Sequence, residues 1–436
     1  MNDLSTQAFD AVVIGAGIVG ASTALELSRA GRRVLVLDKG DSVGGGTTSA
    51  SSSIIRFHYS TLAGCIASWE AMHQWADWAN HLGHAEGALA KFFRTGMLAI
   101  APPGEKFDLY LDHFRTAGIP GRVLVGAEIT ELFPALEVGS FAPAKLPDSP
   151  DFFADPSGEV IALFQPEAGF VDDPQLAAQN LMDAARHFGA TVRLRTRVMD
   201  IVVTNNRVGG VVLEDNTRVL APIVVNAAGP WSSALNRMAG ADADMRIRTR
   251  PMRQTIASCR APEDFSVGAG GCVIADMDLG AYGRPQPGGS YIIGGVESPC
   301  DPAEWLDNAD DADLNPDPQM FEALVYRTAR RIPSVEIPLR PQGLASVYDV
   351  ADDWTPIFDR SCIDGYYMAV GTSGNQFKNG PIIGQIMSTL IDAVEGGHDH
   401  DARSVHMKCT HTGLDLDIGQ FSRLRVPAST GGNVWG

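Results

Sequence analysis

Three glycines and one aspartate near the start of the chain have the types and spacing of a dinucleotide-binding motif. Gly15, Gly17 and Gly20 follow a short apolar run, and Asp38 ends a second apolar run, RVLVLD. Glycines let the backbone come close to a pyrophosphate, whose charge the N-terminus of the following helix stabilises. The acidic side chain can accept hydrogen bonds from ribose hydroxyls and disfavours a 2′-phosphate. The motif predicts a dinucleotide site, with a tight turn in an unrelated α/β domain as the alternative.

A loop rich in hydroxyl groups indicates which dinucleotide binds. The stretch GGGTTSASSSIIRFHY, residues 44–59, comes soon after the strand that ends at Asp38. An extended flavin would continue from its pyrophosphate into such a loop, whereas a nicotinamide cofactor has no use for it. The loop therefore favours a flavin.

The elements that must position these residues follow from the hydrophobic pattern. Residues 10–14, 21–30 and 33–38 predict a strand, a helix and a second strand. Parallel strands need such a crossover, and uninterrupted apolar runs are typical of strands buried on both faces. We further expect a helix over 175–188, a hairpin turning at 205–206, strands over 223–228 and 366–370, a helix over 382–395, and core positions for Trp69, Trp75 and Trp78.

The composition is that of a large globular protein. The chain has 436 residues, of which 45% are hydrophobic and 20% charged, so we expect two domains and exclude a disordered or collagen-like chain. The formal net charge of −18 would repel nucleic acid and anionic lipid. The first residues have no basic region and glycines interrupt the first apolar run, so we expect neither a signal peptide nor a membrane span.

Cysteine and histidine usage argues against disulfides and a metal. The six cysteines are scattered without a C-x-x-C pair, which indicates a reducing compartment and a cytoplasmic location. His398, His400, His406 and His411 gather near the C-terminus, where we expect them to be exposed, with no bound metal. The acidic run DNADDADLNPDP, residues 307–318, is interpreted as a solvated loop.

Five segments resemble the amine- and amino-acid-oxidising flavoproteins of the D-amino-acid oxidase superfamily, and within it the sarcosine oxidases most closely. They are the glycine motif, the run from Ile54 to Tyr59, PEAGFV at 166–171, NAAGPW at 226–231 and SGNQFK at 373–378. The matches keep the family's order and lie at both ends and in the middle of the chain. Residues 90–160 and 240–340 match only loosely.

The resemblance implies a fold of class α/β. It implies a discontinuous Rossmann-type FAD-binding domain, like that of glutathione reductase, and a substrate domain with a mainly antiparallel sheet. We expect residues 1–90, 160–240 and 340–436 in the FAD-binding domain and residues 91–159 and 241–339 in the substrate-binding domain.

The resemblance also implies FAD as the cofactor. The ADP half would lie at the glycine motif and Asp38, and a helix beginning near Phe377 would direct its N-terminal amides to the side of the flavin ring where negative charge collects on reduction. The full set of cofactor-binding residues that we expect is Gly15, Gly17, Gly20, Asp38, Lys39, Thr47, Thr48, Ser49, Ile54, Val198, Gly229, Gly374, Asn375, Gln376, Phe377 and Lys378.

The same resemblance assigns Arg56 and Lys378 to a substrate carboxylate. A guanidinium meets a carboxylate with two hydrogen bonds, which fixes orientation as well as affinity. Tyr282 and Arg284 lie where the family has a tyrosine of the substrate cavity. We expect Arg56, Lys378 and Tyr282 to be catalytic and all four residues to bind substrate. The alternatives are an exposed loop arginine, a surface lysine and a tyrosine that packs on Pro285.

Departures from the family change the expected chemistry. Relatives with covalent flavin have a cysteine just before the tyrosine corresponding to Tyr348, where this chain reads ASVY, so we expect non-covalent FAD. No lysine lies between Lys145 and Lys378, although sarcosine oxidase activates oxygen with a lysine on the strand corresponding to residues 291–295. We therefore expect slow reaction with O2, and an external carrier is the alternative electron acceptor.

The family's SGHGFK has become SGNQFK, which leaves substrate size open.

The resulting hypothesis is an FAD enzyme that removes a hydride from the C–N bond of a small carboxylated amine or amino acid and gives an imine that water hydrolyses. One alternative is oxidation of a 2-hydroxy acid, for which His58 is the nearest base in the sequence. Another is an FAD-binding subunit that transfers electrons within a larger complex.

Overall fold

A six-stranded sheet holds the glycine motif in the computed structural model, which describes residues 8–427. All strands are parallel except one edge strand, β20, which runs antiparallel to β21. β1 and β2 consist of buried apolar residues, as expected for central strands. The order is β20 (Ile357–Arg360), β21 (Tyr366–Val370), β13 (Ile223–Asn226), β1 (Ala11–Ile14), β2 (Val34–Leu37) and β9 (Thr191–Arg193).

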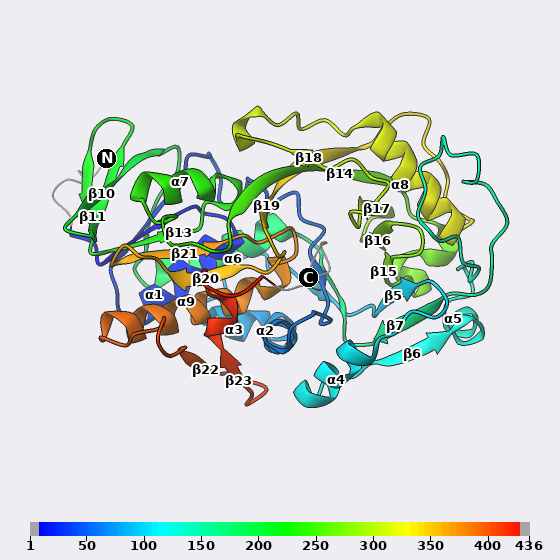
Figure 1. The fold of residues 1–436 in the computed structure, drawn as a ribbon, viewed down its shortest axis with the longest axis horizontal. Coiled ribbons are helices and arrows are strands. Elements are labelled where there is room, and N and C mark those ends of the chain that lie inside the picture. Colours follow the sequence, from blue (N-terminus) through cyan, green and yellow to red (C-terminus); the bar gives the residue numbers. More distant parts are fainter. Residues whose placement is uncertain (1–7, 428–436) are drawn as a thin grey trace.

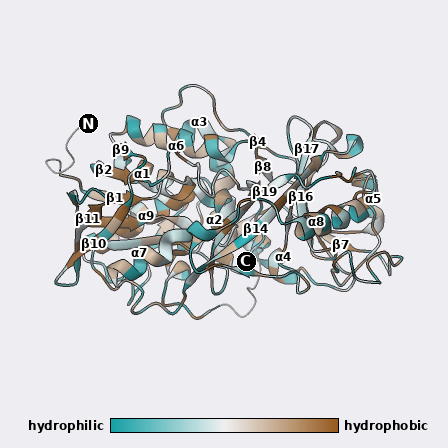
Figure 2. Cartoon of the chain, turned by 90° about the horizontal axis from the view of Figure 1, so that it is seen from above, coloured by the Kyte–Doolittle hydropathy of each residue, from teal (hydrophilic) through white to brown (hydrophobic). Residues whose placement is uncertain are grey.

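The two faces of β1 point into different cores. Ala11 and Val13 belong to a core formed with helices α1 (Ile18–Arg29), α2 (Leu62–Ala76), α6 (Pro174–His187) and α9 (Gly380–Glu395). Val12 and Ile14 pack with a three-stranded sheet and α7 (Ser232–Ala239) on the other face. In Figure 2, β1 and β2 have the brown colour of hydrophobic residues. The result is a layer of helices, a parallel sheet and a smaller antiparallel sheet.

A nine-stranded, mainly antiparallel sheet forms the other half of the molecule (Figure 1). Its parallel pair is β15 with β5, and β19 pairs with the long strand β14. β14 contacts α7 at the first half of the molecule and α8 (Pro318–Arg331) at the second, and so connects the two. The strands are β18 (Glu304–Trp305), β14 (Thr249–Arg260), β17 (Ser290–Gly295), β16 (Ala281–Pro285), β15 (Val273–Asp276), β5 (Met97–Ala101), β7 (Ile161–Gln165), β6 (Arg122–Val125) and β19 (Gly343–Ala351).

Shorter elements complete the fold. Within residues 8–427, no helix has the length and apolar character needed to cross a membrane. The remaining helices and strands are β3 (Ile54–Ile55), α3 (Trp78–Leu82), β4 (Phe92–Phe93), α4 (Asp108–Ala117), α5 (Gly126–Leu132), β8 (Gly169–Val171), β10 (Val198–Thr204), β11 (Arg207–Leu213), β12 (Arg218–Leu220), β22 (His406–Lys408) and β23 (Asp415–Asp417).

The expected elements agree with the structure to within a few residues. The first helix begins at Ile18 rather than at residue 21, because the last glycine of the motif already belongs to it. Asn205 and Asn206 have positive φ angles of 49° and 61°, as the expected hairpin turn between β10 and β11 requires. The three tryptophans are buried, and Trp75 stacks on Trp78 with 4.4 Å between the ring centroids. The mixed α/β fold with a mainly antiparallel second sheet is confirmed.

Two strands belong to a different sheet than their place in the sequence suggested. β7 and β19 lie in segments that we expected in the FAD-binding domain, but both pair within the nine-stranded sheet. The short apolar runs could pair with either sheet, and only the long-range partners, β5 for β7 and β14 for β19, decide between them. The division into domains stays a prediction.

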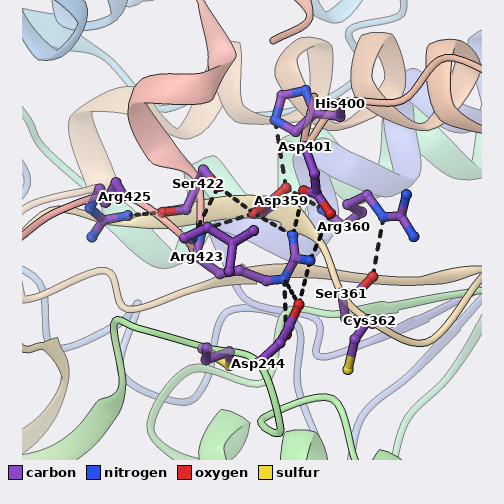
Figure 3. A network of polar contacts seen from close by, with 12 residues as sticks. Asp244, Asp359, Arg360, Ser361, Cys362, His400, Asp401, Ser422, Arg423 and Arg425 are labelled. Carbon is purple, nitrogen blue, oxygen red and sulfur yellow. Dashed lines mark hydrogen bonds and ion pairs between the residues drawn. The ribbon is translucent and has the colours of Figure 1, made fainter. Parts of the chain in front are cut away.

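The C-terminal segment is held to β20 by a buried arginine (Figure 3). The guanidinium of Arg423 binds Asp359 at 3.1 Å, Asp401 at 2.8 Å and Asp244 at 2.6 Å. His400 joins this cluster, with Nε2 lying 3.6 Å from Asp359 and Nδ1 accepting a hydrogen bond from Val405. The expectation of an exposed His400 is therefore wrong, because its partner Asp359 comes from β20, a distant segment of the chain. No cluster suited to a metal ion occurs among residues 8–427.

Candidate functional site

A cavity of about 690 Å³ lies where the two halves of the molecule meet. The turns after β1, β2, β13 and β21 line one side of it, and residues of β14, β16 and β19 line the other. The carboxyl ends of parallel strands are the usual place for a ligand in such a sheet, because the connecting turns leave a crevice there. The fold therefore brings the predicted motif and the second sheet together around one elongated site.

The glycine motif shapes one end of the cavity because side chains would not fit there. Gly15 has a φ of +110°, and a Cβ atom on it would lie 2.3 Å from the carbonyl oxygen of Ala227. A Cβ atom on Gly20 would lie 1.9 Å from the carbonyl oxygen of Gly15. The backbone turns tightly here and leads into α1, whose N-cap residue, Gly17, has no side chain to cap the helix. This is the cradle that a pyrophosphate at a helix N-terminus requires.

Asp38 lies beside this turn with both oxygens fixed. Its Oδ2 accepts a hydrogen bond from the amide of Ala16 at 2.6 Å, and its Oδ1 accepts one from the amide of Gly40 at 2.7 Å. A carboxylate oxygen has a second lone pair, so both oxygens can still accept from ribose hydroxyls. The carboxylate thus also holds the turn that carries the glycines.

Most of the expected cofactor residues line the cavity. Thr48 accepts a hydrogen bond from the amide of Ile18 at 3.1 Å and so links the hydroxyl-rich loop to the start of α1. Ser49 is outside the lining and donates to the carbonyl of Gly46 at 2.8 Å, so we remove it from the proposed set. The residues placed at the cavity are Gly15, Gly17, Asp38, Lys39, Thr47, Thr48, Ile54, Val198, Gly229, Gly374, Asn375, Gln376, Phe377 and Lys378.

The other end of the cavity is formed by the turn after β21. Gly374 has a φ of +68°, and the ring of Tyr348 lies so close that a Cβ atom on Gly374 would be 2.4 Å from it. A 3-10 helix, Phe377–Asn379, follows and continues into α9. Trp75 of α2 donates from Nε1 to the carbonyl of Lys378 at 2.7 Å. The helical start near Phe377 that we expected is present, and α2 holds it in place.

Arg56 and Lys378 come together at this end. Both line the cavity, and only 3% of Arg56 and 2% of Lys378 is exposed. Both cations lie against the ring of Tyr59, and Arg56 donates to the carbonyl of His58 while Lys378 donates to that of Asn375. Burial, with the nearby charge of Arg56, holds the pKa of Lys378 well below its usual range. Neither residue is the surface side chain that the alternative interpretation assumed.

Tyr282 also lines the cavity, from β16. Its hydroxyl lies 2.9 Å from the hydroxyl of Ser52, and burial raises its pKa. Its ring covers Gly294 of β17, where a Cβ atom would lie 2.3 Å from the ring. Tyr282 therefore packs on the neighbouring strand rather than in a turn against Pro285, and its ring occupies the space above Gly294.

Arg284, which we expected to bind substrate, and His58, the possible base, do not line the cavity. Arg284 is fully buried outside the lining, donates from Nε to the carbonyl of Ser52 at 2.6 Å, and lies 4.1 Å from the ring centroid of Phe170. Through this hydrogen bond, Arg284 holds the hydroxyl-rich loop, residues 44–59, against β16. His58 is also buried outside the lining and accepts at Nδ1 from the amide of Gln165 at 2.7 Å. Burial, followed by the charge of Arg56, holds the pKa of His58 well below its usual range.

The sequence did not point to one part of the cavity wall. Asp307, Asn308 and Asp310 of the acidic run line it, together with Trp231. These three residues are exposed, as we expected for a solvated loop, but we did not expect them to line the cavity. A dense run of acidic residues resembles any solvated segment, and the contacts that distinguish it come from other parts of the chain. Trp231 ends the NAAGPW motif, which could have drawn attention to it.

Comparison with known proteins identifies the family of the chain. The family model described as FAD dependent oxidoreductase (DAO) matches residues 10–390. Glycine oxidase of Geobacillus kaustophilus is 23% identical over 401 residues, covering 90% of this chain and 96% of the relative. Human peroxisomal sarcosine oxidase is 24% identical over 409 residues, covering 90% of this chain and 94% of the relative. Three other relatives are longer than this chain, which spans only 40%, 46% and 42% of their length.

A solved structure shows the same fold. The crystal structure of L-proline dehydrogenase from P. horikoshii aligns with a TM-score of 0.75 at 23% identity, covering 96% of this chain and 98% of that one. The glycine cradle, the fixed Asp38 and the long cavity that reaches the turn after β21 fit an extended FAD. Since the family model spans most of the chain and the cavity has the features that this cofactor requires, the protein is a member of the DAO family of FAD-dependent oxidoreductases.

Proposed function

We propose that the protein oxidises the C–N bond of a small carboxylated amine or amino acid and gives an imine that water then hydrolyses. The observation that carries this proposal is the pair of buried cations, Arg56 and Lys378, at the end of the cavity formed by the turn after β21. Two buried cations in one pocket are costly, and an anionic ligand would offset that cost. A carboxylate is the anion that an arginine binds with two hydrogen bonds.

The residues around the pair supply orientation. FAD, when bound, accepts the two electrons of the oxidation. Arg56 and Lys378 would hold the carboxylate, so that the adjacent carbon has one orientation toward the ring. Tyr282, which is buried and uncharged because burial raises its pKa, closes the opposite wall without adding a charge. The amine would react in its neutral form, because a protonated nitrogen has no lone pair to assist the loss of hydride.

The names of the relatives are consistent with this substrate class. Glycine and sarcosine are small amino acids with a free carboxylate, and the relatives named after them share the length of this chain. Arg56 and Lys378 recognise only the carboxylate, which such substrates have in common. The group on nitrogen and the stereochemistry would depend on the wall of the nine-stranded sheet.

We further propose that FAD is bound without a covalent link. All six cysteines lie in the part of the chain that the structure describes, and none of them lines the cavity. The position before Tyr348 is Val347, which cannot form a thioether.

Oxidation of a 2-hydroxy acid has less support. It needs a base at the substrate carbon, and the candidate His58 is outside the cavity lining, with Nδ1 occupied by Gln165. A hydroxy acid could still use the carboxylate site, so the substrate decides between the two reactions.

Anaerobic titration of the purified FAD-containing protein tests the proposal. The panel consists of N-methyl amino acids, D- and L-amino acids, their methyl esters, and 2-hydroxy acids of matched size, and the readout is bleaching of the flavin absorbance. Amino acids with a free carboxylate should bleach the flavin, and their esters should do so only at much higher concentrations. Bleaching by hydroxy acids alone would contradict the proposal. A flavin spectrum that no member changes would support the electron-transfer subunit instead.

A further inference from the structure

The segment between β18 and α8, residues 306–317, is attached to the nine-stranded sheet; we call it the acidic loop. The amide of Leu306 donates to the carbonyl of Pro251 on β14 at 2.9 Å. Arg253 of β14 donates to the carbonyl of Asp313 at 2.6 Å and to that of Asn315 at 2.5 Å. Both ends of the acidic loop are therefore tied to β14, and the loop belongs structurally to the second half of the molecule.

The tip of the acidic loop reaches the first half. It is a short 3-10 turn, Ala309–Asp311, and the side chain of Asn308 accepts a hydrogen bond from the amide of Asp310 at 3.1 Å. Asp310 Oδ1 is bound by Lys39 Nζ at 2.5 Å and by Trp231 Nε1 at 2.8 Å. Lys39 follows β2, and Trp231 follows β13. One carboxylate thus joins the two sheets.

The contact of Asp310 with Lys39 and Trp231, which we call the bridge, lies at the wall of the cavity. Lys39, Trp231 and Asp310 all line it, and Lys39 directly follows Asp38 in the sequence. The ammonium of Lys39 lies 3.7 Å from the ring centroid of Trp231, so the cation is held between an aromatic face and a carboxylate. The hydrogen bond from Lys39 lowers the pKa of Asp310, which keeps the carboxylate ionised at neutral pH.

The bridge has a second, longer contact. Asp310 Oδ2 lies 3.7 Å from a guanidinium nitrogen of Arg197, which precedes Val198 in the same wall. Three groups of the first half therefore converge on one carboxylate of the second half. A single exposed ion pair contributes little, but convergent contacts with good geometry contribute more.

We propose that Asp310 is a positioning residue for FAD, acting as a latch that closes the ADP half of the cavity and slows release of the cofactor. Cofactor that leaves at this end must first separate the acidic loop from Lys39 and Trp231. With no cysteine at the cavity, retention of FAD depends on contacts of this kind. The proposal concerns the cofactor alone and is independent of the substrate class proposed above.

Charge alone predicts the opposite effect, which makes the test decisive. A carboxylate beside a pyrophosphate repels it, so removing the charge of Asp310 would by simple electrostatics tighten the binding of FAD. In the latch, the same change weakens the contacts to Lys39 and Trp231 and lets FAD leave faster.

The experiment uses Asp310→Asn in the FAD-loaded protein. After rapid dilution at about 50 mM salt, the rise of free flavin fluorescence measures the release rate, and calorimetry on the apoprotein measures the dissociation constant. We expect release about tenfold faster than in the wild type, from the loss of a charge-assisted contact in a converging set. Raising the salt to about 500 mM should accelerate release from the wild type and leave the variant nearly unchanged.

Two further variants complete the design. Trp231→Phe keeps the aromatic face for Lys39 but removes the hydrogen bond to Asp310, and it should accelerate release by a smaller factor. Asp311→Asn is the matched control, because Asp311 is an exposed neighbour with the same charge that lies outside the cavity lining. It should release FAD at the wild-type rate. The flavin spectrum and near-ultraviolet circular dichroism confirm that each variant is folded.

Release from Asp310→Asn at the wild-type rate, or more slowly, would overturn the latch. An equal acceleration in Asp311→Asn would also overturn it, since the effect would then come from net charge. If Asp310→Asn does not fold, Trp231→Phe and the salt dependence of the wild type decide the question in the same way.

Discussion

The ammonium nitrogen of Lys378 lies 4.7 Å from the centroid of the Tyr59 ring. The guanidinium carbon of Arg56 lies 4.9 Å from the same centroid. One aromatic ring therefore contacts two buried cations, and its hydroxyl donates to the carbonyl of Asn375 at 3.2 Å. The attraction between a cation and an aromatic ring offsets part of the free energy that the cation loses when it leaves water. This helps to explain how the two cations are accommodated in a buried pocket.

Replacing Arg56 with Met should affect acids far more than esters. A buried carboxylate without its partner costs about 3 to 5 kcal/mol, so kcat/KM for an amino acid should fall more than about a hundredfold. The ester has no charge to leave unpaired and should lose much less. Steady-state kinetics on an acid and its methyl ester measure both losses, and equal losses would show that Arg56 does not contact the carboxylate.

Binding of a simple carboxylate should weaken as the pH rises, because Lys378 loses its proton. Burial and the charge of Arg56 place the pKa of Lys378 well below its ordinary value of 10.5. The protonated form attracts the anion, so affinity is full below this pKa and is lost as the pH rises through it. Acetate serves as the probe because it has no amine to titrate, and its binding is followed by the flavin spectrum. Lys378→Met should bind acetate weakly at every pH; a pH-dependent loss that persists in this variant would exclude Lys378 as its cause.

Asp349 should make stability depend on pH. It is buried beside the cavity turn, where its Oδ2 accepts from the amide of Gly371 at 2.6 Å, and burial raises its pKa from 3.8 to about 7. The folded chain therefore binds this proton more tightly than the unfolded chain, and the stabilisation present below about pH 4 is lost as the pH rises through 7.

Asp349→Asn tests this titration because it keeps the shape and stays neutral. Between pH 4 and pH 9, the free energy of unfolding of the wild type should fall relative to the variant by on the order of 4 kcal/mol. Urea denaturation of the FAD-loaded proteins measures the difference. Parallel pH profiles for the two proteins would show that Asp349 does not titrate in this range.

Reduced flavin should react slowly with oxygen. A cation beside the flavin stabilises superoxide as it forms, and β17 (Ser290–Gly295), the strand on which the family resemblance implies a lysine, has none; Tyr282 covers its Gly294. Stopped-flow reoxidation should be at least about tenfold slower with O2 than with an artificial quinone acceptor. Similar rates would contradict this prediction and would show that the cations already in the cavity, Arg56 and Lys378, are sufficient to activate oxygen.

Arg423→Met should destabilise the whole fold. It leaves Asp359, which is fully buried, without its guanidinium partner, at a cost of about 3 to 5 kcal/mol in unfolding free energy. Arg403→Met is the control, because Arg403 is exposed in the same segment and should change stability by less than about 0.5 kcal/mol. The double variant Asp359→Asn, Arg423→Met should recover part of the loss, since the buried charge is gone; no recovery would argue against the ion pair.

The dinucleotide site could be predicted from the sequence because its parts are local. The turn with Gly15 and Gly17, the helix after it and the strand ending near Asp38 are consecutive, and their geometry depends on backbone sterics and short-range periodicity. The resemblance of the distant motifs added Arg56 and Lys378, and the structure brings these two residues to one pocket.

Other side chains could not be assigned in this way, because their environment depends on segments far away in the chain. Arg284 has the residue type of a substrate ligand, yet its guanidinium binds Ser52 and lies against Phe170, away from the cavity. His400 is in a polar segment, yet Arg423 and Asp359 enclose it. The type of a charged residue does not reveal whether its neighbours are water, a ligand or other side chains.

The amino-acid sequence alone determined the α/β class, the order of the main helices and strands, and the glycine turn at which we expect FAD to bind, since these follow from patterns within a few tens of residues. Only the tertiary structure decided which sheet β7 and β19 join, which charges are buried at the cavity, and that Asp310 reaches Lys39 across it. Those features are contacts between segments far apart in the chain, and their energy depends on distances and burial that exist only after the two halves have packed together.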